Sequence, residues 1–262
     1  VIDYFTDEYM IGRTPNPCVL CNTHIKWEAL LKRADKLGCD FIATGHYANI
    51  NEKSGRYFIS KGKDLNKDQS YALWGISQKN LSRTIFPLGS LEKNEIKKIA
   101  LDRGYDNLVK KSESYEICFV PDNDYRSFLK KRVSNIDKVI KKGDFITEDG
   151  QTVGTHQGYP FYTIGQRKGL GLALGYPIYV TNIDVEKNTV TVGTFDELKR
   201  NGMYVDKLNF MKYDKIDGRL DAFTKIRYND SGNPSVIEKV GDTMKVYLSL
   251  IHISEPTRHN AI

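Results

Sequence analysis

The sequence lacks long apolar runs and has few cysteines. No stretch of about 18 consecutive apolar residues occurs, so no membrane-spanning helix is predicted. Only four cysteines are present among 262 residues, which excludes a scaffold held together by disulfides. Cysteines at this frequency are typical of a reducing cytosol, where thiols serve as ligands or reagents. We therefore expect a cytoplasmic protein with no membrane contact.

Both ends of the sequence look artificial. The first residue is Val1 rather than methionine, and residues 1–5 have the pattern of the middle of an amphipathic helix. The absence of a signal peptide therefore carries no conclusion. Residues 251–262 break off a strand pattern and resemble translated sequencing-adapter read-through. We expect a non-native tail there and leave it out of the fold prediction.

The composition favours a globular protein with a polyanionic partner. Hydrophobic residues make up 40% of the chain, enough for two or three modest domains with cores. The formal net charge of +6 is a modest excess that favours binding to a polyanion.

The most informative stretch, residues 13–22, reads Arg-Thr-Pro-Asn-Pro-Cys-Val-Leu-Cys-Asn. Two prolines on either side of Asn16 predict a stiff, extended loop, with a helix from about Thr23. The loop would present Cys18 and Cys21 near the helix N-terminus, where positive potential favours a thiolate. This segment alone fits an active-site loop and equally a structural thiol pair or zinc knuckle.

A parallel α/β arrangement is predicted next. Apolar residues recur at helical spacing from Trp27 to Leu37, and the short apolar run 41–43 then leads into Gly45 and His46. Ligands of parallel sheets bind beyond the carboxyl ends of the strands, so these two residues are site candidates. The alternative is that His46 is a structural residue, buried in the core with its hydrogen bonds made there.

The remainder of this domain is predicted as a hairpin and two helices. The hairpin covers residues 50–61 with its turn at 53–55. Ser77 is expected to cap a short helix, and Ser90 a longer one that ends at Arg103. The residues expected to be buried on the longer helix are Ile96, Ile99 and Ala100. The domain is expected to end near residue 109.

A basic central domain is expected at residues 110–176. It starts with a charged linker, residues 110–114, and then presents Cys118 between apolar residues. Between residues 126 and 142 there are seven basic residues and one acidic residue. Such a run is usually a solvated face, but beside a candidate thiol it favours phosphate contacts.

Two further patterns follow in the central domain. Asp149-Gly150 predicts a two-residue hairpin turn. The glycine-rich run 165–171 contains Arg167 and Lys168 but is not a Walker loop, because its lysine is misplaced and no Ser or Thr follows. Its amides and cations suit a nucleic-acid backbone. From residue 177 to 250, short strands at regular spacing predict a small β-barrel.

Several of these stretches together resemble the tRNA-specific 2-thiouridylase family. The shared motifs are residues 12–17, Cys18-x-x-Cys21 with the distant 117–119, and residues 43–47, 66–71 and 165–171. The resemblance spans about residues 1–248. It implies an incomplete, Rossmann-like α/β PP-loop ATP pyrophosphatase domain (1–109), a central tRNA-binding and persulfide domain (110–176), and an all-β barrel (177–250).

That family replaces the C2 oxygen of the wobble uridine of tRNA with sulfur. The resemblance implies that ATP, with Mg2+, adenylates this oxygen, and that a persulfide on Cys118 supplies the sulfur. Attack by Cys21, or by the freed sulfide, completes the exchange, with a Cys21–Cys118 disulfide as a product. A sulfur donor protein, either a cysteine desulfurase or a sulfur relay protein, would load Cys118.

The resemblance also implies binding residues. Gly45 is implied to touch ATP. The residues implied to border the flipped target base are Asn16, Pro17 and Cys18. Those implied to contact tRNA are His46, Lys67, Asp68, Gln69, Arg227 and Tyr228.

This chain departs from the family pattern in two places. The glycine-rich PP-loop lies upstream in the family, so we expect the whole protein to be a tRNA-uridine 2-sulfurtransferase and this chain alone to be inactive. Many members also carry an aspartate, proposed as a general base, immediately before Val19-Leu20-Cys21, where this chain has Cys18.

A zinc- or iron–sulfur-stabilised RNA-binding module is the alternative from another class. Cys18, Cys21 and Cys118 would be its ligands, and three thiolates suit a [4Fe–4S] cluster with one open iron. Zinc would need a fourth ligand, for which Cys39 is a poor candidate because it opens a strand expected to be buried. No metal ligand is therefore assigned.

Overall fold

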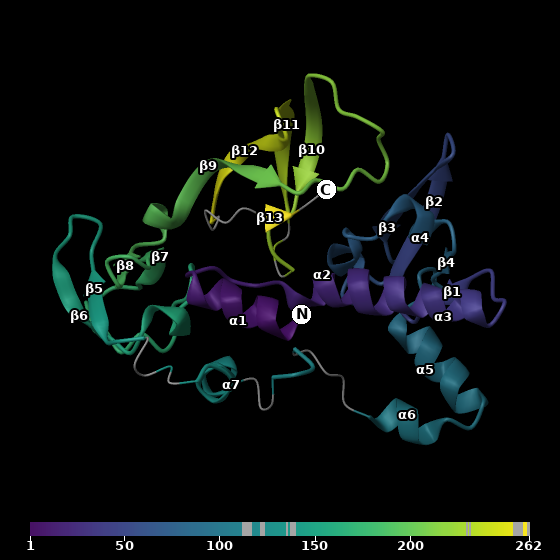
Figure 1. The fold of residues 1–262 in the computed structure, drawn as a ribbon, viewed down its shortest axis with the longest axis horizontal. Helices are drawn as coiled ribbons and strands as arrows, with labels where there is room; N and C mark the ends of the chain where they lie inside the picture. The colour runs from purple at the N-terminus through teal and green to yellow at the C-terminus, as the bar shows by residue number, and fades with distance from the viewer. Residues whose placement is uncertain are drawn as a thin grey trace. The chain divides into compact units, whose positions relative to one another are not determined.

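The computed structural model describes residues 1–111, 117–120, 124–134, 136, 140–228, 230, 232–253 and 259–260, with side chains as far as residue 248. The chain forms two compact units built from separated stretches of sequence (Figure 1). Unit 1 comprises Val1–Pro17, Glu116–Val205 and Gly218–His259. Unit 2 comprises Cys18–Tyr115, Asp206–Asp217 and Asn260–Ile262. Residues 112–114 of the expected linker, and 254–258 and 261–262 of the expected tail, lie outside the described residues.

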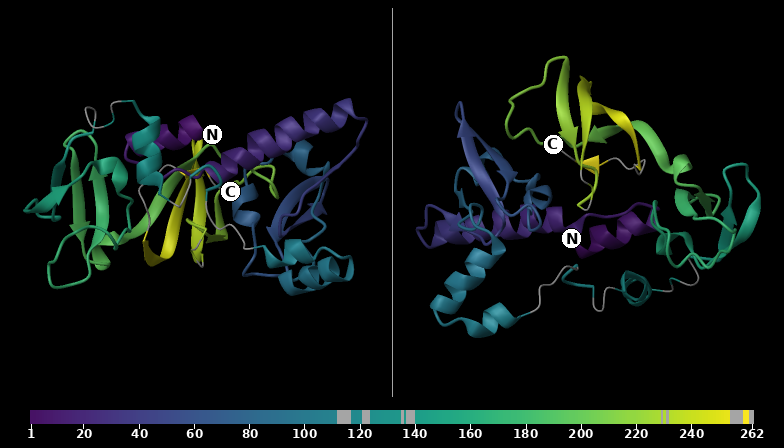
Figure 2. Two further views of the ribbon diagram at one scale, coloured as in Figure 1. Left: turned by 90° about the horizontal axis from the view of Figure 1, so that it is seen from below. Right: turned by 180° about the vertical axis from the view of Figure 1, so that it is seen from behind.

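One continuous helix runs from Pro17 to Lys36 (Figures 1 and 2). Its parts are α2 (Pro17–Leu20), a π-helix (Cys21–Ala29) and α3 (Leu30–Lys36). The expected extended loop up to Thr23 is therefore wrong, since the helix begins at Pro17. Proline suits the first helical position because the N–H it lacks would have no partner there anyway.

A parallel strand pair follows this helix. β1 (Ile42–Ala43) pairs with β4 (Thr84–Ile85), which confirms the parallel α/β prediction. β4 has no counterpart in the sequence analysis, because two residues are too few to show a pattern. Trp27 is fully buried between the helix and this pair, and its Nε1 donates to Thr84 Oγ1 at 2.8 Å. Cys39, expected at the start of a buried strand, is exposed.

The predicted hairpin and the Ser77 cap are confirmed. β2 (Ala48–Lys53) pairs with β3 (Arg56–Lys61) across Ser54 and Gly55, whose φ angles of 53° and 74° suit a tight hairpin turn. Ser77 accepts a hydrogen bond from Asn80 N at the start of α4 (Gln78–Leu81). The 3-10 helix of Ser70–Leu73 precedes it.

The longer helix begins later than expected. α5 (Lys93–Asp102) is capped by Glu92, which forms a capping box with Glu95, rather than by Ser90. None of its residues is buried and Ile99 is 43% exposed, so the expected burial of Ile96, Ile99 and Ala100 is wrong. α6 (Asp106–Lys110) follows.

The described residues of unit 1 include two α-helices and a four-stranded sheet, besides most of the C-terminal strands. The helices are α1 (Ile2–Met10) and α7 (Tyr125–Arg132). The sheet has the order β6-β5-β8-β7, formed by β5 (Gly143–Ile146), β6 (Thr152–His156), β7 (Tyr179–Asp184) and β8 (Thr189–Gly193). A hairpin joins β5 to β6 at the predicted place, but its turn is not the two-residue Asp149-Gly150 turn. Gly150 N donates to Thr147 O at 2.9 Å, so Glu148 and Asp149 are the central residues, and Gly150 follows them at φ 86°. This sheet lies on both sides of the boundary expected at 176/177.

The C-terminal strands confirm the all-β prediction but form an open sheet in the described residues. The order is β10-β11-β12-β9-β13, with the strands labelled in Figure 1. The strands are β9 (Lys199–Asp206), β10 (Arg219–Thr224), β11 (Asn233–Val240), β12 (Thr243–Ile253) and β13 (His259–Asn260). Short 3-10 helices occur at Tyr159–Phe161 and Asp196–Leu198. β12 pairs with β9 as far as Ile253, beyond the expected start of the tail at residue 251.

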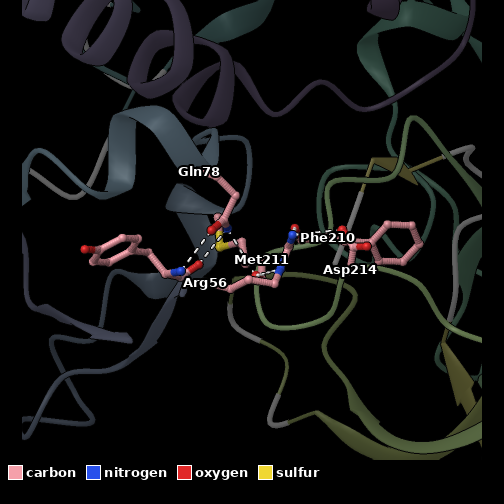
Figure 3. Close-up of polar contacts among 6 residues, drawn as sticks. Arg56, Gln78, Phe210, Met211 and Asp214 are labelled. Atoms are coloured by element: carbon pink, nitrogen blue, oxygen red, sulfur yellow. Dashed lines mark hydrogen bonds and ion pairs between the residues drawn. The ribbon is translucent and has the colours of Figure 1, made fainter. Parts of the chain in front are cut away.

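The connection between β9 and β10 packs on the hairpin of unit 2 (Figure 3). The Arg56 side chain donates to two backbone carbonyls, Met211 O at 3.2 Å and Phe210 O at 2.7 Å. It also pairs with Asp214 at 3.0 Å. Gln78 Nε2 donates to Met211 O at 3.1 Å, so two side chains converge on one carbonyl. Residues 206–217 are thereby fixed to unit 2.

Arg56→Ala should lower the free energy of unfolding of unit 2 by about 2 kcal/mol, because hydrogen bonds from a charged donor are lost. Both tryptophans of the chain, Trp27 and Trp74, lie in unit 2, so urea unfolding followed by tryptophan fluorescence measures it. Proteolysis within residues 206–217 should also become faster. The control is Arg219→Ala, which removes an exposed ion pair with Glu238 in unit 1 and should cost little. Equal effects of the two variants would contradict this account.

Candidate functional site

The helix that carries Cys18 and Cys21 is held by contacts of the two residues that follow Cys21. Asn22 is buried, and its Nδ2 donates to Ala72 O at 2.8 Å. Gly75 lies so close to the helix that a Cβ there would collide with Thr23 Oγ1. On this fixed backbone Cys18 is exposed and Cys21 is partly exposed, and both thiols are unoxidised.

Cys21 is also the first residue of the π-helical stretch. Such stretches are rare and occur frequently at functional sites, because the wider turn breaks the regular hydrogen-bond ladder. The transition from α to π winding therefore coincides with the thiol that the family resemblance marks as catalytic.

His46 is buried beside the same helix and is neutral. Lys26 Nζ lies 3.4 Å from His46 Nε2, and Thr44 Oγ1 lies 2.9 Å from His46 Nδ1. An ammonium can only donate, so Nε2 accepts and Nδ1 carries the proton. Burial, with a smaller contribution from Lys26, lowers the pKa of His46 to about 4. His46 thus orders Lys26 at neutral pH without carrying charge.

The segment of Lys67, Asp68 and Gln69 lies directly beside Tyr47, the residue after His46. Gln69 Oε1 accepts from Tyr47 N at 3.0 Å, and Gln69 N donates to Tyr47 O at 2.9 Å. Asp68 is buried, and its Oδ1 accepts from Gly62 N at 3.0 Å. The structure therefore brings these residues together with Gly45 and His46.

Gly45 itself is exposed just beyond the carboxyl end of β1. Since β4 runs parallel to β1, this is the rim of the sheet at which ligands of parallel α/β folds bind. The absence of a Cβ leaves the backbone of Gly45 open to a close approach by a ligand.

Cys118 lies in unit 1, exposed on a short turn. Val120 N closes the turn by donating to Ile117 O at 2.9 Å. The next residue, Phe119, packs edge-on against Phe5 of α1, with ring centroids 5.2 Å apart. An exposed thiol on an aromatic anchor is accessible to a donor and yet has a defined backbone position.

The remaining candidates, Asn16, Pro17, Arg227 and Tyr228, lie in unit 1. Asn16 and Pro17 end the first stretch of unit 1, where the backbone of Asn16 hydrogen-bonds Tyr4. Arg227 donates to Ile164 O at 2.9 Å, and Tyr228 is exposed. Cys21 belongs to unit 2 and Cys118 to unit 1.

Sequence reasoning missed Lys26 as a partner of His46 and Asn22 as the anchor of the Cys21 helix. Their helical spacing from Cys21 was available in the sequence, but their partners lie 20 and 50 residues away. In the part of the chain that the structure describes, no group of three or more His, Cys, Asp or Glu side chains lies close enough to hold a metal ion. None of the described helices has the length and apolar character needed to cross a bilayer.

Comparisons with known proteins show to which family the chain belongs. Residues 1–122 match a family model described as tRNA methyl transferase HUP domain. Residues 126–194 match one described as tRNA methyl transferase PRC-barrel domain. The chain is 66% identical over 94% of its length to the tRNA-specific 2-thiouridylase MnmA of Amoebophilus asiaticus. It belongs to the tRNA-specific 2-thiouridylase family.

Further members of the 2-thiouridylase family are also similar to this chain over most of its length. The enzymes named MnmA from Cytophaga hutchinsonii and Salinibacter ruber are 61% and 56% identical to this chain, each over 94% of it. The chain spans 66%, 67% and 65% of the lengths of these three relatives. The PRC-barrel match covers the four-stranded sheet of unit 1, which lies upstream of most of the region expected to be a barrel.

The burial of neutral His46 makes the stability of unit 2 depend on pH. Below pH 6.5 the unfolded chain binds a proton that folded His46 does not bind until about pH 4, so the free energy of unfolding falls across this window as pH drops. Between pH 7 and pH 5 the loss should be about 2 kcal/mol. Urea unfolding followed by tryptophan fluorescence measures it, and His46→Gln should remove this part of the pH dependence. An unchanged dependence in that variant would show that other groups cause it.

Cys18, in the first turn of the helix, occupies the position of the family's aspartate. If the thiolate of Cys18 replaces that base, Cys18→Asp in the full-length protein should retain thiolation. The acidic limb of its pH–rate profile should move downward, because a carboxyl ionises near pH 3.9 and a thiol near 8.5. The comparison variant is Cys18→Ala, which should lose most activity. A fully active alanine variant would show that Cys18 only fills space.

Proposed function

We propose that the whole protein transfers sulfur to C2 of the wobble uridine of tRNA, in an ATP-dependent reaction that yields 2-thiouridine. The main support is the pair of accessible thiols, Cys21 and Cys118, each on a backbone fixed by buried neighbours and each within a motif of the family. Two of the relatives are named tRNA-specific 2-thiouridylases.

Cys118 is the proposed sulfur carrier. A donor protein, either a cysteine desulfurase or a sulfur relay protein, transfers sulfane sulfur to the exposed thiolate, which gives a persulfide. The terminal sulfur of the persulfide attacks C2 of the adenylated uridine, and AMP leaves with the former C2 oxygen. The uridine sulfur is then joined to Cys118 through an S–S bond.

Cys21 is the proposed resolving thiol. Its thiolate attacks the Cys118 sulfur, so the S–S bond to the uridine sulfur breaks and a Cys21–Cys118 disulfide forms. An alternative order, in which Cys21 first releases sulfide that then attacks C2, gives the same products. Either route requires the sulfurs of Cys21 and Cys118 to come within about 2 Å of each other when the disulfide forms.

ATP is proposed to bind at the rim beyond β1, where Gly45 is exposed and lacks a side chain that could block the phosphates or base. ATP would enter as a substrate with Mg2+ and activate the C2 oxygen. The HUP description of residues 1–122 is consistent with a nucleotide site. The proposed route uses only the two thiols, ATP and the donor protein. We therefore assign no step to an iron–sulfur cluster.

The proposed tRNA contacts follow the family motifs. Asn16, Pro17 and Cys18 would border the flipped base. The contacts with the rest of the tRNA would come from His46, Lys67, Asp68, Gln69, Arg227 and Tyr228. For His46 and Asp68 the burial suggests an indirect role, since they order the neighbouring Lys26 and the 67–70 segment.

The carrier assignment predicts that Cys118→Ser abolishes thiolation, because a hydroxyl oxygen cannot hold sulfane sulfur. The full-length variant should still bind tRNA with unchanged affinity. Mass spectrometry of tRNA nucleosides measures 2-thiouridine, and a binding assay measures affinity. Cys39→Ser, at another exposed thiol, is the matched control and should remain active. Retained 2-thiouridine formation by Cys118→Ser would refute the assignment.

A further inference from the structure

One segment of unit 1, residues 161–168, includes two cationic residues and is contacted by three further cationic side chains. Phe161, Tyr162 and Ile164 are 5%, 6% and 4% exposed, so the segment is anchored in the core. Arg167 and Lys168 follow on the exposed side. The buried half of the segment therefore holds its exposed half at a fixed place on the surface.

Two cations come from α7, four residues apart on one face of that helix. Arg126 Nε donates to Phe161 O at 3.0 Å, and its guanidinium lies 5.5 Å from the centroid of the Tyr162 ring. Lys130 Nζ lies 5.3 Å from the centroid of the Phe161 ring. Carbonyls and rings are neutral, so both side chains keep a full positive charge at this surface.

A third cation reaches the segment from the far end of the sequence. Arg227 donates to Ile164 O at 2.9 Å across a sequence separation of 63 residues. Asp124 lies near Arg126, and its carboxylate accepts hydrogen bonds from Ser127 N and Ser127 Oγ. Three cationic side chains therefore contact residues 161–164, and two more follow at positions 167 and 168.

The exposed end of the segment is rigid. Gln166 Oε1 accepts from Thr163 N at 3.2 Å, and Gln166 Nε2 donates to Lys168 O at 2.9 Å. The backbone is also tied to β7, with Gly165 N donating to Val180 O at 2.7 Å and Val180 N to Gln166 O at 3.0 Å. Arg167 and Lys168 thus project from an ordered backbone.

We propose that Arg126, Lys130, Arg227, Arg167 and Lys168 form one binding surface for the phosphate backbone of RNA. The cations contact successive residues of an anchored segment instead of converging on one point, which suits a chain of phosphates better than a single free anion. The aromatic rings beneath are covered by Arg126 and Lys130, so the surface offers charge rather than a stacking platform for bases. It holds tRNA without reading its sequence.

This inference rests on the proposed function, and it adds α7 to the tRNA interface. The probe is an unmodified tRNA transcript, with its affinity for the protein measured over a series of salt concentrations. Lys130→Gln and Arg167→Gln should each reduce the log–log slope by about 0.7 to 0.9, the value for one lost phosphate contact. The double variant should lose about twice that. Lys187→Gln, an exposed lysine of the β7–β8 turn in the same unit, is the control with an unchanged slope. Melting curves verify that each variant is folded.

A second experiment distinguishes a surface for an RNA backbone from a site for a single free phosphate. At equal ionic strength, inorganic phosphate should displace tRNA no better than chloride. Stronger displacement by phosphate would overturn the proposal in favour of a single-anion site. An unchanged slope in Lys130→Gln, with tRNA still bound and thiolated, would overturn this surface and leave the proposed function standing. Absence of tRNA binding by the unmutated protein would overturn both.

Discussion

The burial of Trp27 is the constraint on which the unit 2 part of the site depends. Its ring is fully buried, and its Nε1 donates to Thr84 Oγ1, the first residue of β4. One side chain thereby joins the Cys21 helix to the parallel strand pair. The same ring lies 5.4 Å from the His46 ring, so the helix, the rim of the sheet and the buried histidine form one packed body. The positions of Cys21, Lys26 and Gly45 relative to one another follow from this packing.

Under the proposed function, the Cys118 thiol of unit 1 has to accept sulfur from a donor protein and then deliver it to the tRNA. Cys118 is exposed, whereas the residue after it packs against Phe5 and Phe128. Helix α1, at the start of the sequence, therefore supports the turn that holds Cys118. The placement of the two thiols in separate units fits a cycle in which the carrier is first loaded and then resolved by Cys21.

Local signals in the sequence predicted local structure well. The Ser54-Gly55 turn and the Ser77 cap depend on a few adjacent residues, and both are confirmed. The hairpin predicted from Asp149-Gly150 is also present, but its turn is longer than two residues. Pro17 could not be assigned from such a signal, because proline suits an extended loop and the first turn of a helix equally. β4, the exposure of Ile99 and the contact between Arg227 and Ile164 depend on residues distant in sequence, which no local pattern records.

The central claim is that Cys118 carries the transferred sulfur, and isotope-labelled sulfur tests it most directly. The full-length protein is loaded by a cysteine desulfurase supplied with labelled cysteine, digested without reductant, and analysed by peptide mass spectrometry. We predict one labelled sulfur on the Cys118 peptide, which disappears on addition of tRNA and ATP and is recovered in 2-thiouridine. Label on the Cys21 peptide instead, or label on Cys118 that never reaches tRNA, would contradict the account.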